Sequence, residues 1–78
     1  MGLVEPRPVQ IRGDMILLQA LLKLLGFVSM GGEVRALLAE GGIKVNGEKE
    51  DRRGRKLKNG DVVDLPDRTR VRIVAEFE

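Results

Sequence analysis

The 78-residue sequence predicts an α+β fold in which two helices precede a small antiparallel sheet. Two observations lead to this prediction. Residues 15–38 hold two segments of helix-forming apolar residues, whereas from Ile43 onward apolar and polar residues alternate between turn signals. The length suits one small domain, so we expect a single domain over 9–78, opening with a short edge strand over 9–12, after a flexible lead-in over 1–8.

The first helix is predicted over residues 15–25. Asp14 is a good N-cap, the residues after it are almost all strong helix formers, and Gly26 suits a C-terminal stop. The helix is apolar on most sides, with only Gln19 and Lys23 marking a polar edge. Such a helix needs cover on most sides, which leaves open that part of it faces a partner protein or a second copy of the chain.

The second helix is predicted to begin after Ser29, its expected N-cap. Apolar residues recur in it at helical spacing and two glycines end it: Val34, Leu37, Leu38, Gly41 and Gly42. Gly31 and Gly32 fall in the first turn, where each glycine costs about 1 kcal/mol of helix stability. We therefore expect a close approach to the backbone there, by either the first helix or a phosphate.

The sheet is predicted from alternating residues between turns. Segments 43–45 and 48–50 form a tight hairpin, since Asn46-Gly47 between them accepts the positive φ angles of a type I′ turn. There follow a basic connection over 51–58, a turn at 59–60, a buried strand over 62–65 and a turn at 66–67. The last strand alternates, and its inward face is expected to carry Val71, Ile73, Ala75 and Phe77.

The residue types present predict that the chain is not an enzyme and needs no metal or cofactor. It has no Cys and no His, which removes disulfides, the usual zinc ligands, thiol nucleophiles and imidazole acid–base chemistry. Ser29 and Thr69, its hydroxyl-bearing residues, have no evident base nearby in the sequence. Asp61, Asp64 and Asp67 recur at intervals of three, but the strand and turn between them would splay the carboxylates apart.

The sequence predicts a cytoplasmic protein with no membrane partner. Its first ten residues, MGLVEPRPVQ, place an acid and two prolines where a signal peptide needs an unbroken apolar stretch. No apolar run approaches the roughly 18 residues of a membrane span.

The net charge of +2 conceals an uneven distribution. Residues 1–42 carry four basic and four acidic side chains, whereas residues 43–60 carry seven basic and three acidic ones, a balance of +4. Residues 61–78 carry three basic and five acidic side chains, a balance of −2. A basic patch attracts polyanions, although a charge run can also be only a solvated face. With no Trp or Tyr, base stacking is not expected, and recognition of shape and phosphates remains.

Three local motifs follow one another after the serine-glycine start of the second helix. They are Val45-Asn46-Gly47, Arg52–Leu57 (RRGRKL) and Gly60–Val63 (GDVV). In this order and spacing, over residues 9–74, the chain resembles the RNA-binding domain family named after the fourth protein of the small ribosomal subunit, especially its small free-standing bacterial members.

The resemblance implies an αα-β domain whose RNA-facing surface is built from the second helix and the basic hairpin region. It implies structured RNA, ribosomal or transfer RNA, as the partner, with the ribosomal particle as its setting. The N-terminus of the second helix is a natural phosphate seat beside the cationic loop. Carried over by position, the RNA-binding residues are Ser29, Gly31, Gly32, Arg35, Lys44, Lys49, Arg52, Arg53, Arg55, Lys56 and Lys58. The alternative function is a protein-interaction or homodimerisation module that uses the apolar first helix.

Overall fold

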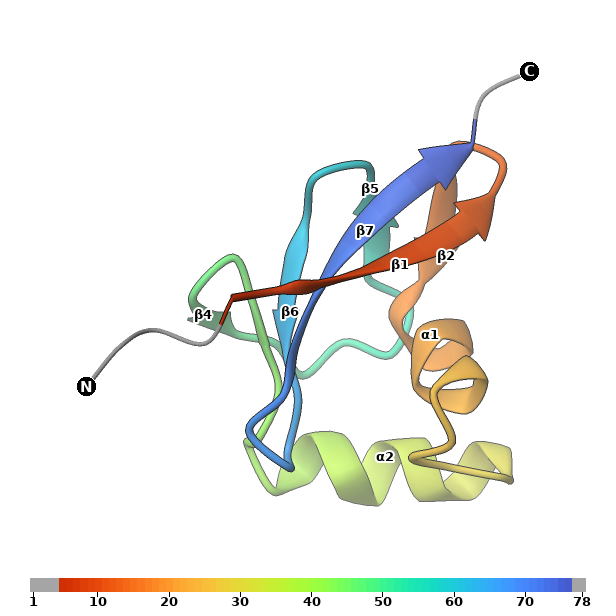
Figure 1. Ribbon diagram of the computed structural model, residues 1–78. Helices are drawn as coiled ribbons and strands as arrows, with labels where there is room; N and C mark the ends of the chain where they lie inside the picture. The colour runs from red at the N-terminus through yellow and green to blue at the C-terminus, as the bar shows by residue number, and fades with distance from the viewer. Residues whose placement is uncertain (1–4, 77–78) are drawn as a thin grey trace.

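Residues 5–76 are described by a computed structural model, which joins two helices to a twisted sheet (Figure 1). The helices are α1 (Leu18–Leu24) and α2 (Gly31–Ala39). The main sheet has the strand order β1-β7-β6-β3-β4, and its strands are β1 (Arg7–Arg12), β3 (Lys44–Val45), β4 (Glu48–Lys49), β6 (Val62–Asp64) and β7 (Arg70–Glu76). A separate antiparallel pair joins β2 (Met15–Leu17) to β5 (Lys56–Lys58). The predicted α+β class is confirmed.

The main sheet is mixed, so the expected wholly antiparallel arrangement is wrong. β1 runs parallel to β7, with Val9 opposite Ile73, while the other neighbours are antiparallel. The strand predicted over 9–12 does lie at the sheet edge, but it begins at Arg7, within the segment expected to be a flexible lead-in. Pro8 is tolerated because an edge strand need not donate every N–H. Residues 1–4 of that lead-in lie outside the described residues.

The first helix is shorter than predicted, because it begins at Leu18 and residues 15–17 form β2 instead. The extended residue Leu17 is its N-cap and makes no side-chain cap bond, so Asp14 does not cap this helix. The strong helix propensity of residues 15–17 is overridden by pairing with residues 56–58, which supplies their backbone with hydrogen bonds across the chain.

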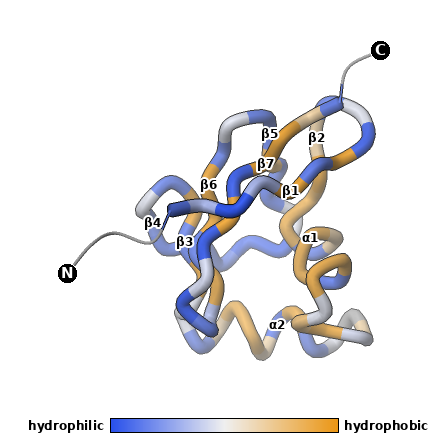
Figure 2. The backbone as a smooth tube through the Cα atoms, viewed as in Figure 1, coloured by the Kyte–Doolittle hydropathy of each residue, from blue (hydrophilic) through white to orange (hydrophobic). Residues whose placement is uncertain are grey.

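Both helices and the strands enclose one hydrophobic core. Figure 2 shows α1 mostly in the hydrophobic colour. Leu18, Leu21 and Leu22 are fully buried, so the chain itself covers most of the apolar surface of this helix, whereas Leu24 is 61% exposed. The other buried apolar residues are Ile11, Val28, Val34, Leu38, Ile43, Val45, Leu57, Val63, Leu65, Val71 and Ile73.

In the second half of the chain the predicted turns and the last strand are present, but the connection expected over 51–58 is wrong at its end. Residues 56–58 form β5, because their backbone pairs with residues 15–17. The turn between β3 and β4 has positive φ at Asn46 (52°) and Gly47 (86°), which confirms the predicted hairpin. In β7, Val71 and Ile73 are buried and Ala75 is half-buried, as the alternation predicts, while Phe77 lies outside the described residues. In the part of the chain that the structure describes, neither helix is long and apolar enough to cross a membrane.

Candidate nucleic-acid interface

The basic loop, residues 51–55 between β4 and β5, is fixed to the start of α1. The backbone N–H of Leu18 donates to the carbonyl oxygen of Arg55 at 2.8 Å, and that of Gln19 donates to the carbonyl oxygen of Arg53 at 3.0 Å. The first N–H groups of a helix have no partner inside it, so these carbonyls do the work of a side-chain cap. The loop therefore has a defined backbone path that presents its arginines outward.

A buried carboxylate holds two of these arginines. Glu50 is only 5% exposed, and its Oε1 accepts from Arg55 Nη1 at 2.8 Å while its Oε2 accepts from Arg52 Nε at 3.0 Å. The same Oε2 also accepts from the backbone N–H of Arg52 at 3.0 Å. These bonds, the one from the Arg52 side chain foremost, outweigh the effect of burial and lower the pKa of Glu50 to about 2.

The remaining N–H groups of both guanidinium ions are available for a ligand. A guanidinium carries more N–H donors than these contacts with Glu50 use. The side chain of Arg52 is 69% exposed and that of Arg55 is 31% exposed. Glu50 therefore anchors the two arginines without covering them.

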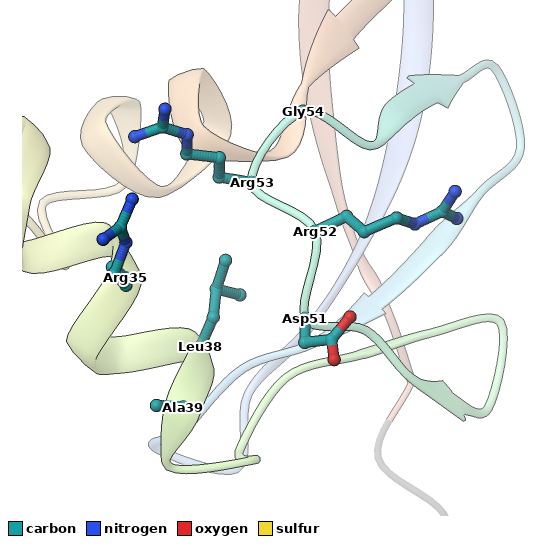
Figure 3. A pocket seen from close by; sticks show the side chains of 7 residues that line it. All are labelled: Arg35, Leu38, Ala39, Asp51, Arg52, Arg53 and Gly54. Atoms are coloured by element: carbon teal, nitrogen blue, oxygen red, sulfur yellow. The ribbon is translucent and has the colours of Figure 1, made fainter.

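A hollow of about 540 Å³ lies between α2 and the basic loop. Its lining residues are Arg35, Leu38, Ala39, Asp51, Arg52, Arg53 and Gly54. In Figure 3 the side chains of Arg35 and Arg53 extend into the same space from opposite walls, and Arg52 points the other way. Among the described residues neither Arg35 nor Arg53 has an acidic partner. Asp51 also lines the hollow, but its carboxylate points away from Arg35 and Arg53 in Figure 3. Two cations that extend into one space in this way favour a bound anion.

A second hollow, of about 730 Å³, lies on the other side of the loop. Its lining residues are Arg52, Gly54, Arg55, Lys56, Lys58 and Asp61. Because both hollows include Arg52 and Gly54, the basic loop forms the ridge between them. The arrangement thus offers cations on two sides of one ridge.

The turn between β5 and β6, beside the second hollow, is held by hydrogen bonds of Asn46 and Asp61. Asn46 Nδ2 donates to Asp61 Oδ1 at 3.1 Å, and Asn46 Oδ1 accepts from the backbone N–H of Val62 at 2.9 Å. Asp61 Oδ2 accepts from the backbone N–H of Lys58 at 2.8 Å. The hairpin predicted from Asn-Gly turn chemistry therefore also fixes the end of β5, where Lys58 lies.

Lys44 and Lys49 lie outside both hollows. They face each other across the β3–β4 pair, and Lys44 also stands opposite Asp64. The Cε atom of Lys49 lies 3.2 Å from the position that a Cβ of Gly41 would take, next to the end of α2. The predicted role of Lys44 and Lys49 in RNA binding stays a prediction.

The start of α2 already holds an acid. Oε1 of Glu33 accepts from the hydroxyl of Ser29 at 2.8 Å and from the backbone N–H groups of Ser29 and Met30 at 3.0 and 2.9 Å. These bonds lower the pKa of Glu33, and they place its carboxylate beside the residues that precede α2. A phosphate at the start of this helix stays a prediction. Met30, not Ser29, is the N-cap residue.

Gly32, in the first turn of α2, does not mark a close approach of α1. Gly32 is exposed, and a Cβ there would meet nothing within 4 Å. The surroundings of Gly31 lie outside what the structure describes. The remaining interpretation of Gly32, an approach by a phosphate, stays a prediction.

The three regularly spaced aspartates bind separate partners. Asp61 serves the turn described above, Asp64 forms an ion pair with Arg70, and Asp67 accepts from the backbone and hydroxyl of Thr69. In the described residues no group of acidic side chains is arranged to hold a metal ion.

Comparison with known proteins identifies the family of this chain. The chain matches the S4 domain family over residues 9–74, and it belongs to that family. A relative described as a probable ribosome maturation protein RlbA, from Bacillus subtilis (strain 168), is 43% identical over 58 residues, which cover 74% of this chain and 82% of that protein.

Proposed function

We propose that this chain is a non-enzymatic RNA-binding protein that docks structured RNA on the basic loop. The observation that carries the proposal is the ridge itself, a loop with a fixed backbone and cations on both sides. Arg35 and Arg53 serve the hollow beside α2, and the second hollow is served by Arg52, Arg55, Lys56 and Lys58. Guanidinium groups suit this task because their fork of N–H groups matches a phosphate.

The cations on two sides of the ridge favour a folded RNA over a free single strand. A folded RNA brings two backbone segments close together, so the ridge can lie between them and contact phosphates of both. Sequence-specific readers of single strands generally stack bases on aromatic side chains, and this chain has no Trp or Tyr. Recognition would then rest on backbone geometry.

We infer ribosomal RNA as the target and the cytoplasm as the location. The relative from Bacillus subtilis is described as a probable ribosome maturation protein, which supports a ribosomal substrate. The sequence, free of Cys and His, offers no thiol or imidazole for catalysis, which supports a binding role. Transfer RNA is the competing target and belongs in the same assay.

The experiment is the salt dependence of binding to a ribosomal RNA stem-loop. We expect the logarithm of the affinity to fall linearly with the logarithm of the salt concentration, with a slope that corresponds to about 3 to 5 neutralised phosphates. A single strand of equal length should bind at least about tenfold more weakly. Equal affinity for both RNAs would refute recognition of a folded RNA.

A matched pair of double variants locates the surface. Arg53→Ala with Lys56→Ala should weaken binding and reduce the magnitude of the salt slope by about 1 to 2. Arg7→Ala with Arg12→Ala removes the same charge from β1, at the opposite edge of the sheet from β4, and should change the slope far less. Equal effects of the two variants would show that only net charge matters.

A further inference from the structure

We infer that Glu50 is a positioning residue for RNA binding. It improves the affinity for RNA although its negative charge makes the RNA-facing surface less positive. The inference rests on the proposed function. It is carried by the contacts of one buried carboxylate with the side chains of Arg52 and Arg55, on the side of the ridge that carries the second hollow.

The position of Glu50 decides which way the arginines point. Its backbone N–H donates to the carbonyl oxygen of Ile43 at 3.0 Å, so the carboxylate stands on the rigid β3–β4 hairpin. From there it fixes Arg52 through both its backbone and its side chain, and Arg55 through Nη1. Arg53, which has no such tether, points to the opposite side of the ridge (Figure 3). Glu50 thereby holds the side chains of Arg52 and Arg55 beside the second hollow, apart from that of Arg53.

Two opposing effects follow from this arrangement. The negative charge lowers the attraction for a polyanion, and removing it alone should strengthen binding. The tethers, however, restrict two long side chains that would otherwise lose rotamer freedom when they bind a phosphate. We expect the second effect to dominate, because the carboxylate is buried behind the guanidinium groups and is therefore farther from the RNA than they are.

Glu50→Gln against Glu48→Gln is the test. Glu48 is exposed on the same hairpin and lies in neither hollow, so both variants remove one negative charge by the same chemical change. Glu48→Gln should leave the Kd for the stem-loop unchanged or slightly lower. Glu50→Gln should raise the Kd about five- to tenfold, against the direction of the charge change. If Glu50→Gln binds as tightly as Glu48→Gln, the inference is wrong.

Two further measurements separate positioning from folding and from the proposed function. In the free wild-type protein, NMR relaxation should show the Arg52 Nε–H group ordered and that of Arg53 mobile; equal mobility would overturn the inference without any variant. Thermal melting identifies any loss of affinity that is due to unfolding. The variant Glu50→Asp, which keeps a carboxylate on a shorter side chain, should bind more tightly than Glu50→Gln. Failure of the wild-type protein to bind RNA would instead refute the proposed function.

Discussion

The carbonyl oxygen of Arg53 accepts a hydrogen bond from the backbone N–H of Gln19 at 3.0 Å, so the basic loop and the first turn of α1 are one structural unit. Arg55 and Leu18 are joined in the same way at 2.8 Å. The amides of Leu18 and Gln19 should therefore exchange slowly with solvent, although first-turn amides usually lack a partner. Hydrogen exchange followed by NMR measures this. The amide of exposed Gly32, in the first turn of α2, is the internal control, and equally fast exchange at all three would contradict a fixed loop.

The burial of α1 predicts a large difference between two leucines on the same helix. Leu22 is fully buried, so Leu22→Ala should lower the free energy of unfolding by about 2–5 kcal/mol. Leu24 is 61% exposed, and Leu24→Ala should change it by less than about 0.5 kcal/mol. Urea denaturation of the two variants provides the comparison. If Leu24→Ala lowered the free energy of unfolding more than Leu22→Ala, and did so only at high protein concentration, Leu24 would lie in a contact between two copies of the chain.

Acid should weaken the fold through Glu50. Its pKa is about 2 in the folded protein against an ordinary 4.5, so the carboxylate stabilises the fold above pH 4.5. That contribution is lost as the pH falls from 4.5 through 2, because the unfolded chain binds the proton first. The pKa values of Glu33 and Asp67 are lowered too, so some acid sensitivity should persist without Glu50. Between pH 2 and 6, the free energy of unfolding should therefore depend less steeply on pH in Glu50→Gln than in the wild-type protein. Identical slopes would contradict the ion-pair assignment.

Substitution of Gly47 should lower the stability of the fold, whereas substitution of Gly54 should weaken RNA binding. Gly47 has a φ of 86°, so Gly47→Ala should cost about 1 kcal/mol of stability through backbone strain. Gly54 has an ordinary φ and a Cβ there would meet nothing within 4 Å, so Gly54→Ala should leave the melting temperature nearly unchanged. If RNA docks on the ridge as proposed, the added methyl group meets the RNA backbone, and we expect several-fold weaker binding. Unchanged affinity for the stem-loop would show that RNA does not approach Gly54 closely.

The elements encoded by local signals were predictable from the sequence, and those that depend on distant pairing were not. The Asn46-Gly47 turn and the alternation of β7 are local features, and the structure has both. Residues 15–17 have helix propensity, yet pairing with residues 56–58 makes them a strand. The parallel partner of β1 is likewise close only in the folded chain.

The same distinction applies to the candidate site. The charge partition identified the basic loop, because charge density is visible in the sequence. It did not identify Glu50, which looked like one more strand residue before the cationic run; its burial and its two arginine partners are properties of the folded chain. Nor did it reveal that Glu33 occupies the start of α2, since the direction of a side chain there is set by the local turn.

The most direct test of the central claim is an NMR titration of the protein with the ribosomal RNA stem-loop. We predict that the signals that move most belong to the basic loop, to residues 56–58 and to Arg35, on both sides of the ridge. The signals of β1 and of Leu24 should move little. If the largest changes instead cluster on β1 or around Leu24, the basic loop is not the RNA-binding surface.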